Sequence, residues 1–283
     1  MKSLADSEQN ILIDKVSDDI ELSNISSINF KGLPGDKNNY YDKKLIITIV
    51  SNKGGVGKTS IAIAVAMFFS KEIKKKILLL ELDSSPGDFG VIFDIENNKS
   101  LELALRFPEK YNEYVKNIYK NVDALKGMSN PLIAENIKKD AVNLLVDFIS
   151  KDYDYIIVDT QTVINGPVLD ILKLSDEILA ISEYSLESIA RVSSLIDTLV
   201  KKFSIPEYKI KFIVNKRKFL HIFKVWDISK IIKMPIYAFI RFDGKFSKSK
   251  FIFNKGSIFN TRFFKEIKKI FKKNIGINND VER

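Results

Sequence analysis

The sequence predicts an α/β fold, a doubly wound and mostly parallel sheet with helices on both faces. Short apolar runs rich in β-branched residues alternate with longer segments of helical character from residue 44 to residue 273. Several runs end on an acidic or amide residue, and doubly wound sheets bind ligands beside the carboxyl ends of their strands. A glycine-rich stretch directly follows the first run. We expect one domain at 44–273, with a polar, partly ordered extension at 1–43 and a polar tail at 274–283.

Composition excludes several kinds of site and separates two regions of opposite charge. The 283 residues contain no cysteine, which excludes disulfides, thiolate metal sites and cysteine nucleophiles. The first residues lack the apolar core of a signal peptide, and no run approaches the ~18 apolar residues of a membrane span, so we expect a cytoplasmic protein. Residues 201–283 hold 22 Lys and Arg against 6 Asp and Glu, a net charge of +16, whereas residues 1–200 carry −7. Two interpretations are open for the basic third: an anionic partner such as DNA, a membrane or an acidic protein, or a solvated lysine-rich surface.

Residues 51–60, Ser-Asn-Lys-Gly-Gly-Val-Gly-Lys-Thr-Ser, predict a phosphate-binding loop between the apolar run 45–50 and a small, apolar helix at 61–69. The glycines allow backbone N–H groups to approach a phosphate, and the start of the helix adds unpaired N–H groups and a positive dipole end. Lys58 is expected to contact the β- and γ-phosphates of ATP, and the Thr59 hydroxyl to hold Mg²⁺. The predicted cofactor-binding loop comprises Gly54, Gly55, Val56, Gly57, Lys58, Thr59 and Ser60.

The stretch Lys-Gly-Gly-Val-Gly-Lys-Thr at 53–59 resembles the deviant Walker A motif of the MinD/ParA family of dimeric ATPases. The resemblance implies a slow ATPase that uses ATP and Mg²⁺, dimerises with ATP and returns to a monomer after hydrolysis. It also implies that Lys53, the signature lysine, contacts the nucleotide bound by the partner subunit. A solvated loop charge is the alternative for Lys53.

Residues 76–83, Lys-Ile-Leu-Leu-Leu-Glu-Leu-Asp, predict a buried strand that ends in acids. Glu81 and Asp83 occupy the two acidic positions of the Asp-x-Asp motif of the family. The resemblance implies that Asp83 orients the attacking water or contacts the magnesium shell, while a helix cap or loop charge is the structural alternative. The segment 84–105 resembles the CpaE/TadZ subgroup of pilus-assembly proteins. The predicted catalytic residues are Lys53, Lys58 and Asp83.

Residues 154–160, Asp-Tyr-Ile-Ile-Val-Asp-Thr, predict a Walker B strand in which Asp159 holds magnesium through a water. The preceding residues 109–150 are expected to be helical, with a break near 128–131. Relatives usually have proline after the threonine, and this chain has Gln161. The predicted metal-site residues are Thr59, Asp83 and Asp159.

The last third of the chain predicts strands at 176–182, 209–215 and 234–240 and a long helix at 186–203. The resemblance implies that Asn215 hydrogen-bonds the adenine, with a turn-forming asparagine as the alternative. It also implies that the loop after residue 240 packs on the base, which makes Asp243 a predicted cofactor contact.

Residues 261–273 are expected to form an amphipathic helix that packs on the core with its lysines outward. A basic tail that lies on a membrane is the alternative. The predicted apolar face comprises Phe263, Phe264, Ile267, Ile270 and Phe271.

These motifs and the resemblance imply an ATP-dependent switch that positions a pilus or secretion machinery through a protein partner at a polar or membrane-associated site. Such a protein would act in the cytoplasm or peripherally at the inner face of the membrane. Two other functions stay open. One is a partition ATPase that binds nucleoid DNA non-specifically through the basic residues 201–283, and the other is an ATP-binding scaffold with little hydrolysis.

Overall fold

A computed structural model of the chain describes residues 44–73, 75–84, 86–130, 137–138, 140–218, 228, 230–248 and 254–275. The predicted extension at 1–43 and residues 276–283 of the predicted tail lie outside the described residues. The domain boundaries at 44 and 273 therefore stay predictions.

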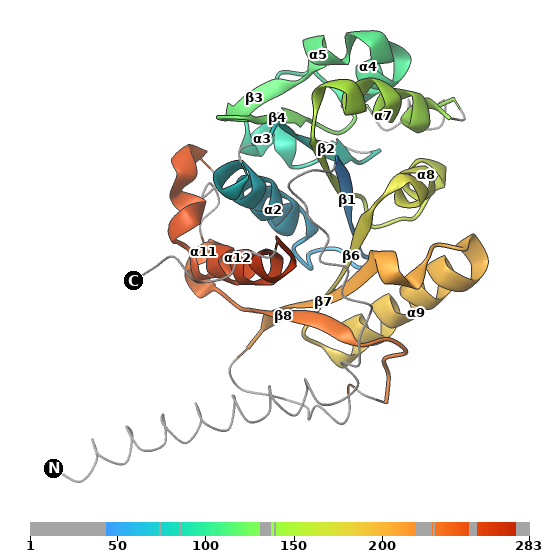
Figure 1. The fold of residues 1–283 in the computed structure, drawn as a ribbon, viewed down its shortest axis with the longest axis vertical. Coiled ribbons are helices and arrows are strands. Elements are labelled where there is room, and N and C mark those ends of the chain that lie inside the picture. Colours follow the sequence, from blue (N-terminus) through green and yellow to red (C-terminus); the bar gives the residue numbers. More distant parts are fainter. Residues whose placement is uncertain are drawn as a thin grey trace, which may run out of the picture.

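Eight strands of the described chain form one sheet in the order β3-β4-β2-β5-β1-β6-β7-β8 (Figure 1). Neighbouring strands are parallel throughout, except for the antiparallel pair β3 and β4. The predicted doubly wound, mostly parallel sheet is confirmed. The strands are β1 (Leu45–Val50), β2 (Ile77–Leu82), β3 (Lys116–Tyr119), β4 (Val122–Leu125), β5 (Tyr155–Thr160), β6 (Glu177–Glu183), β7 (Ile210–Arg217) and β8 (Ile236–Arg241).

Helices cover both faces of the sheet, as Figure 1 shows. One face packs against α2 (Lys58–Glu72), α3 (Phe89–Ile92) and α12 (Arg262–Ile275), and the other packs against α4 (Leu101–Arg106), α7 (Ala141–Asp152), α8 (Gly166–Leu174) and α9 (Leu186–Phe203). The remaining helical segments are α5 (Tyr111–Tyr114), α11 (Gly244–Lys248), and the 3₁₀ turns η1 (Pro108–Lys110), η2 (Glu207–Lys209) and η3 (Asn254–Asn260).

The central strands are buried on both faces, which explains their continuous apolar sequences. In β2, Leu78 and Leu80 belong to the core under α7 and α8, whereas Ile77 and Leu79 belong to the core under α2. Successive strand residues point to opposite faces, so a strand covered on both sides needs apolar residues at every position. For this reason continuous apolar runs, and not alternating apolar and polar residues, predicted these strands.

The predicted helical region 109–150 is wrong in its middle part. Residues 116–125 form the hairpin β3–β4, which turns at Lys120 with φ 35°. β4 pairs in parallel with β2, with Val122 opposite Ile77, and this pairing buries Val122 completely. Sheet pairing therefore decides the conformation of two four-residue segments whose own sequence is ambiguous. The helical expectation is confirmed at α5 and α7.

The C-terminal helix α12 packs on the core as predicted. Phe263, Phe264, Ile267 and Phe271 are buried, Ile270 is half-buried, and the lysines at 265 and 269 are exposed. The Phe271 ring lies 5.9 Å from the Phe68 ring and 5.6 Å from the Phe69 ring of α2. The apolar face of α12 is thus occupied by the domain itself.

Truncation of the Phe271 side chain should destabilise the domain, because its ring is buried where α12 packs on α2. We expect Phe271→Ala to lower the free energy of unfolding by about 3–5 kcal/mol, measured by urea denaturation. Lys269→Ala on the exposed face of the same helix should change it by less than about 0.5 kcal/mol. Equal stability of the two variants would contradict the packing of α12 on the sheet.

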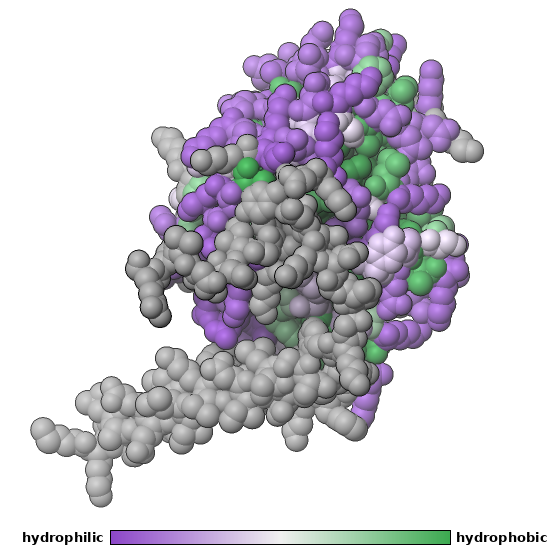
Figure 2. Space-filling model, in the orientation of Figure 1, coloured by the Kyte–Doolittle hydropathy of each residue, from purple (hydrophilic) through white to green (hydrophobic). Residues whose placement is uncertain are grey.

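Figure 2 shows a mostly hydrophilic face, with smaller groups of apolar side chains over α7 and α8. In the described part of the chain, no helix combines the length and apolarity that a membrane crossing requires.

Candidate functional site

The glycine-rich loop lies between the end of β1 and the start of α2. Gly55 and Gly57 have φ of 72° and 100°, and Gly57 is the N-cap of α2. A Cβ atom at Gly57 would lie 2.6 Å from Asn215 Nδ2, so this position needs glycine for both conformation and space. No side chain of the described residues caps α2, which leaves the first N–H groups of the helix for an anion.

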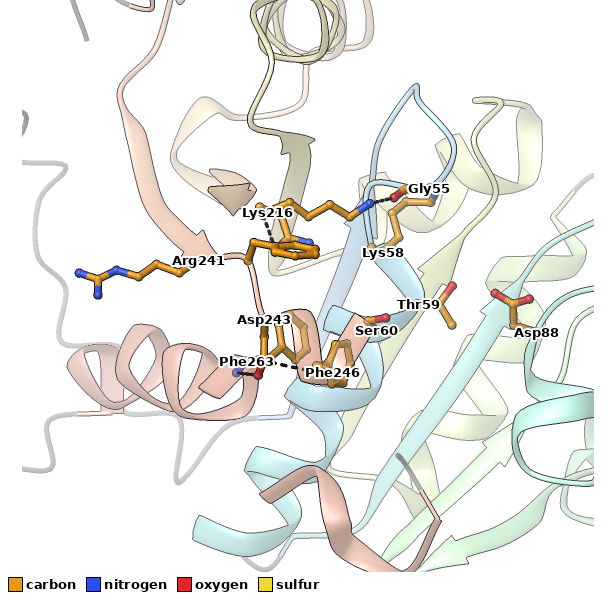
Figure 3. Close-up of a pocket in the computed structure, with 13 residues that line it drawn as sticks. Gly55, Lys58, Thr59, Ser60, Asp88, Lys216, Arg241, Asp243, Phe246 and Phe263 are labelled. Atoms are coloured by element: carbon orange, nitrogen blue, oxygen red, sulfur yellow. Dashed lines mark hydrogen bonds between the residues drawn. The ribbon is translucent and has the colours of Figure 1, made fainter. Parts of the chain in front are cut away.

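A pocket of about 410 Å³ opens beside this loop (Figure 3). One end is formed by the start of α2 and by Asp88. The other is formed by the last residues of β7 and β8, the residues that follow β8, and one residue each of α11 and α12. Its lining residues are Gly55, Gly57, Lys58, Thr59, Ser60, Asp88, Asn215, Lys216, Arg241, Phe242, Asp243, Phe246 and Phe263.

Asp159 lies near the end of β5 and is 4% exposed. Burial raises its pKa to about 7, against the effect of a hydrogen bond with Thr59 and the charge of Lys58. Its Oδ1 atom has no hydrogen-bond partner among the described residues. A buried carboxylate oxygen without a partner, beside a threonine hydroxyl, fits a hard cation such as Mg²⁺.

The described residues contain no cluster of three or more His, Asp or Glu side chains that could hold a metal by itself. Mg²⁺ in nucleotide sites takes one or two protein ligands together with phosphate oxygens and waters. The structure brings Thr59 and Asp159 together, and their role as metal ligands stays a prediction.

Lys58 lies among three acidic side chains at this end of the pocket. Burial lowers the pKa of its ammonium, while the charges of Asp159, Asp83 and Asp88 oppose that shift in decreasing order. Its Nζ lies 3.5 Å from Thr162 Oγ1, in the loop after β5. The structure therefore brings Lys58 close to the predicted metal-site residues Asp83 and Asp159.

Glu81 and Asp83 have different surroundings, although they share one motif. Glu81 is buried, and its carboxylate accepts N–H bonds from Asp88 (2.7 Å), Phe89 (3.1 Å) and Gly127 (2.7 Å). Burial raises the pKa of Glu81 to about 7, and these three bonds oppose the shift. Asp83 is half-buried and acts on the charge of Lys58. The charge of Asp83 therefore acts on Lys58, whereas the Glu81 carboxylate is engaged by backbone N–H groups.

Gln161, at the position where the family resemblance implies proline, joins two loops beside the pocket. Its Oε1 accepts hydrogen bonds from the backbone N–H and the hydroxyl of Ser84, and its Nε2 donates to the Val163 carbonyl (3.1 Å). The loop after β5 is therefore fastened to the loop after β2. Proline could form none of these side-chain bonds.

Lys53 is not among the residues that line the pocket and is ion-paired within its own chain. Its Nζ contacts Glu183 Oε1 at the end of β6, and the two side chains are 29% and 28% exposed. Asn52 Nδ2 donates to the Arg191 carbonyl of α9 (3.0 Å), which ties the loop to the same side. A contact between Lys53 and the nucleotide of a partner stays a prediction.

Asn215 lies at the pocket as predicted, but its amide is engaged by the protein backbone. Its Nδ2 donates to the Val56 carbonyl (2.8 Å), and its Oδ1 accepts the N–H of Lys216 (2.8 Å). Asn215 thus connects β7 with the phosphate loop. Its contact with adenine stays a prediction.

Asp243 also lines the pocket, and its carboxylate joins the starts of two helices. Oδ1 accepts the N–H groups of Lys245 (3.0 Å) and Phe246 (3.1 Å), and Oδ2 accepts that of Phe263 (3.2 Å). Partial burial would raise the pKa of Asp243, but these backbone bonds and one from Arg262 together lower it. In this arrangement the carboxylate caps α11 and α12, and a contact with the base stays a prediction.

Among the lining residues, Lys216 and Phe242 had no assigned role in the sequence prediction. Lys216 has a φ of 59°, and its Nζ donates to the Gly55 carbonyl at the tip of the loop. Phe242 is 40% exposed at the end of the pocket opposite to Asp88. The sequence signal for Lys216 and Phe242 is adjacency, since each lies beside a predicted contact at the end of a strand.

Residues 44–210 of the chain match the family AAA_31, described as an AAA domain. The chain is also similar to MJ0169, an uncharacterised ATP-binding protein of Methanocaldococcus jannaschii, with 32% identity over 141 residues. That match covers 48% of this chain and 52% of MJ0169, so the chain spans about half the length of this relative.

Two solved structures have the same fold. A ParA family ATPase from Chlorobium tepidum superimposes with a TM-score of 0.71 and 23% identity, covering 80% of this chain and 98% of that protein. The septum site-determining protein MinD from Pyrococcus horikoshii, complexed with Mg-ADP, gives a TM-score of 0.66 with 16% identity over 81% of this chain and 95% of that protein.

Proposed function

Since the chain belongs to the AAA_31 family and is a P-loop ATPase of the MinD/ParA kind, we propose that it is an ATP-dependent dimerising switch that positions a cellular assembly. The observation that carries the proposal is the buried Asp159 oxygen without a partner beside Thr59, at the open start of α2. This arrangement provides for a metal-bound triphosphate. The similar MinD of P. horikoshii holds Mg-ADP.

ATP binding falls to the backbone and to Lys58. The N–H groups of residues 54–57 and the start of α2 surround the phosphates, and Lys58 compensates their charge. Thr59 and Asp159 would hold Mg²⁺, which when bound neutralises charge on the β- and γ-phosphates. Ser60 follows Thr59 in the same first turn and lines the pocket.

Hydrolysis requires a positioned water and a stabilised leaving group. We assign the water to Asp83, which lies at the carboxyl end of β2 and within the charge environment of Lys58. Lys53 supplies a further positive charge to the nucleotide of the partner subunit, where it would stabilise the transition state. In the single chain Lys53 is held by Glu183, so dimerisation has to replace that ion pair. This requirement supports slow turnover that a partner stimulates.

The base would lie at the end of the pocket that is rich in aromatic side chains. Phe242 is 40% exposed there, and the Phe246 and Phe263 rings stack with centroids 4.4 Å apart. Asn215 and Asp243 stay assigned to this end as cofactor contacts, directly or through the loops that they fix.

The assembly that the switch positions is proposed from the sequence resemblance alone. The resemblance of residues 84–105 to pilus-assembly proteins favours a pilus or secretion machinery, with a protein partner at a polar or membrane-associated site in the cytoplasm. The name of the similar MinD, septum site-determining protein, is consistent with a positioning function of this kind.

The proposal is tested by ATP turnover together with sedimentation velocity in ADP and in a non-hydrolysable ATP analogue. We expect measurable hydrolysis and a dimer in the analogue only. No nucleotide binding would refute the proposal. A dimer that binds ATP but shows no turnover would identify the scaffold instead.

A DNA partition ATPase is the second candidate, favoured by the net charge of +16 over residues 201–283. Several of these lysines are exposed, at 201 and 202 on α9 and at 265 and 269 on α12. If the protein binds duplex DNA through six to ten phosphates, affinity should fall by about 10³–10⁵-fold between 50 and 200 mM salt, measured by fluorescence anisotropy.

A variant pair separates a specific basic surface from general charge. The double variant Lys265→Ala/Lys269→Ala should reduce the slope of log affinity against log salt concentration by about two if both lysines contact phosphates. The control Lys110→Ala, an exposed lysine in the acidic residues 1–200, should leave this slope unchanged. Absence of DNA binding at low salt would exclude this candidate.

A further inference from the structure

Asp88 lines the phosphate end of the pocket, although no motif assigned it a role there. Figure 3 shows its carboxylate beside Thr59, on the side of the pocket away from Asp243. Asp88 is exposed, so its carboxylate is accessible from the pocket and from water. Its charge acts on both Lys58 and Asp159, which places it in the same electrostatic environment as the predicted metal site.

The backbone of Asp88 is held by hydrogen bonds to the buried Glu81 carboxylate. One oxygen of the buried Glu81 carboxylate accepts the N–H groups of Asp88 (2.7 Å) and Phe89 (3.1 Å), and the other accepts that of Gly127 (2.7 Å). The next side chain along, Phe89, is completely buried and packs edge-on against the Phe93 ring, with centroids 5.4 Å apart. The segment that carries Asp88 is therefore held at two consecutive residues.

Gly87 permits this close approach. A Cβ atom at Gly87 would overlap the Glu81 carboxylate, and one at Gly127 would lie 3.1 Å from Glu81 Oε2. The backbone segments at 87 and at 127 can therefore approach the Glu81 carboxylate this closely only because both residues are glycine. The result is an exposed acidic side chain on a fixed backbone, which is the arrangement that an ion-binding group requires.

We propose that Asp88 is a further acidic residue of the magnesium–triphosphate end, contacting the waters of bound Mg²⁺, and that Glu81 is the residue that positions it. The inference rests on the proposed function, because it concerns the same nucleotide. Its second support is Asp159, whose buried oxygen has no partner among the described residues and lies beside Thr59. Mg²⁺ keeps several waters in nucleotide sites, and an exposed carboxylate at the rim can accept hydrogen bonds from them.

The charge of Asp88 has opposite effects with and without the metal. Without Mg²⁺ the carboxylate repels the triphosphate and weakens nucleotide binding. With Mg²⁺ it attracts the hydrated ion and strengthens binding. Asp88 should therefore increase the dependence of nucleotide affinity on magnesium, which is an equilibrium property separate from turnover.

The test measures the Kd of a fluorescent ATP analogue in excess Mg²⁺ and in EDTA. The magnesium dependence is the Kd in EDTA divided by the Kd in Mg²⁺. For Asp88→Asn we expect this ratio to fall by about fivefold to tenfold, because binding improves in EDTA and weakens in Mg²⁺. The control is Asp94→Asn, which removes the same charge from a fully exposed position outside the pocket and should leave the ratio unchanged. An unchanged ratio in Asp88→Asn would overturn the assignment of Asp88.

Glu81→Gln tests the positioning role. Its amide NH₂ would face one of the N–H groups that the carboxylate accepts, so the segment should shift and the magnesium dependence should fall as in Asp88→Asn. The double variant should then show no further decrease, because both changes remove one effect. Additive decreases, or a Glu81→Gln variant that keeps the full ratio, would contradict the positioning role.

The proposed function and the role of Asp88 are refuted by different outcomes. A wild-type protein that binds no nucleotide with or without Mg²⁺ would refute the proposed function. A wild type with strong magnesium dependence and an Asp88→Asn variant that retains it would refute only the role of Asp88. If Glu81→Gln does not fold, as judged by its thermal unfolding, the Asp88→Asn and Asp94→Asn pair still decides the proposal.

Discussion

Lys58→Ala should abolish ATP binding. Lys58 is the cation that faces Asp159, Asp83 and Asp88 at the phosphate end of the pocket. Its removal loses the contact with the phosphates and also leaves three carboxylates to repel them. Since a hydrogen bond to a charged group contributes about 1.5–3 kcal/mol and the repulsion adds to that loss, affinity should fall by more than about 100-fold in a fluorescent-nucleotide titration.

Asp83→Ala is the matched comparison. Asp83 acts on the attacking water, so its removal should leave ATP binding within about threefold and eliminate turnover. Lys71→Ala, in the last turn of α2, controls for the loss of a positive charge on the same helix and should affect neither property. Equal loss of binding in the Lys58 and Asp83 variants would contradict this division of roles.

Lys53→Ala should bind ATP as a monomer and fail both to dimerise and to hydrolyse. The lysine is expected to meet the phosphates of the partner subunit, in an interface with little water where a positive charge has a large effect. Sedimentation velocity in a non-hydrolysable analogue measures the dimer, and a phosphate-release assay measures turnover. A Lys53→Ala variant that dimerises like wild type would exclude the contact across the interface.

Glu183→Gln offers the opposite change at the same place. It removes the charge that holds Lys53 within its own chain, while Lys53 itself is kept. Because a partly exposed ion pair contributes about 0.2–1 kcal/mol and a symmetric dimer has to replace two such pairs, the dimerisation constant should improve by up to about 30-fold. Weaker dimerisation of this variant would show that Glu183 supports the dimer rather than restrains Lys53.

The central strands and the phosphate loop could be predicted from the sequence because local patterns determine them. The runs at 45–50, 77–82 and 155–160 are apolar at nearly every position, since both faces of the sheet are covered. The positive φ of Gly57 is likewise a local requirement, whereas its close contact with Asn215 depends on a strand that is distant in sequence. The hairpin at 116–125 could not be predicted, because its outcome depends on the pairing of β4 with β2, which is distant in sequence.

The chemical types in the site could be predicted, whereas the partners of individual side chains could not. Glu81, Asp83 and Asp243 are all carboxylates at or just beyond strand ends, but Glu81 and Asp243 accept backbone N–H groups. What distinguishes them is the course of the chain around each one. Asp243 lies before the starts of α11 and α12, and Glu81 lies beneath a loop that only Gly87 allows so close.

The side chain of Gln161 links the loops after β2 and β5 by hydrogen bonds. Its bonds to Ser84 and to the Val163 carbonyl link the segment beside Asp83 with the segment that leads into α8. Val163 is 68% exposed, and Val91, which follows Asp88 on α3, is 74% exposed. The exposed Val163 therefore belongs to a loop that is hydrogen-bonded, through Gln161, to the loop that carries Asp83.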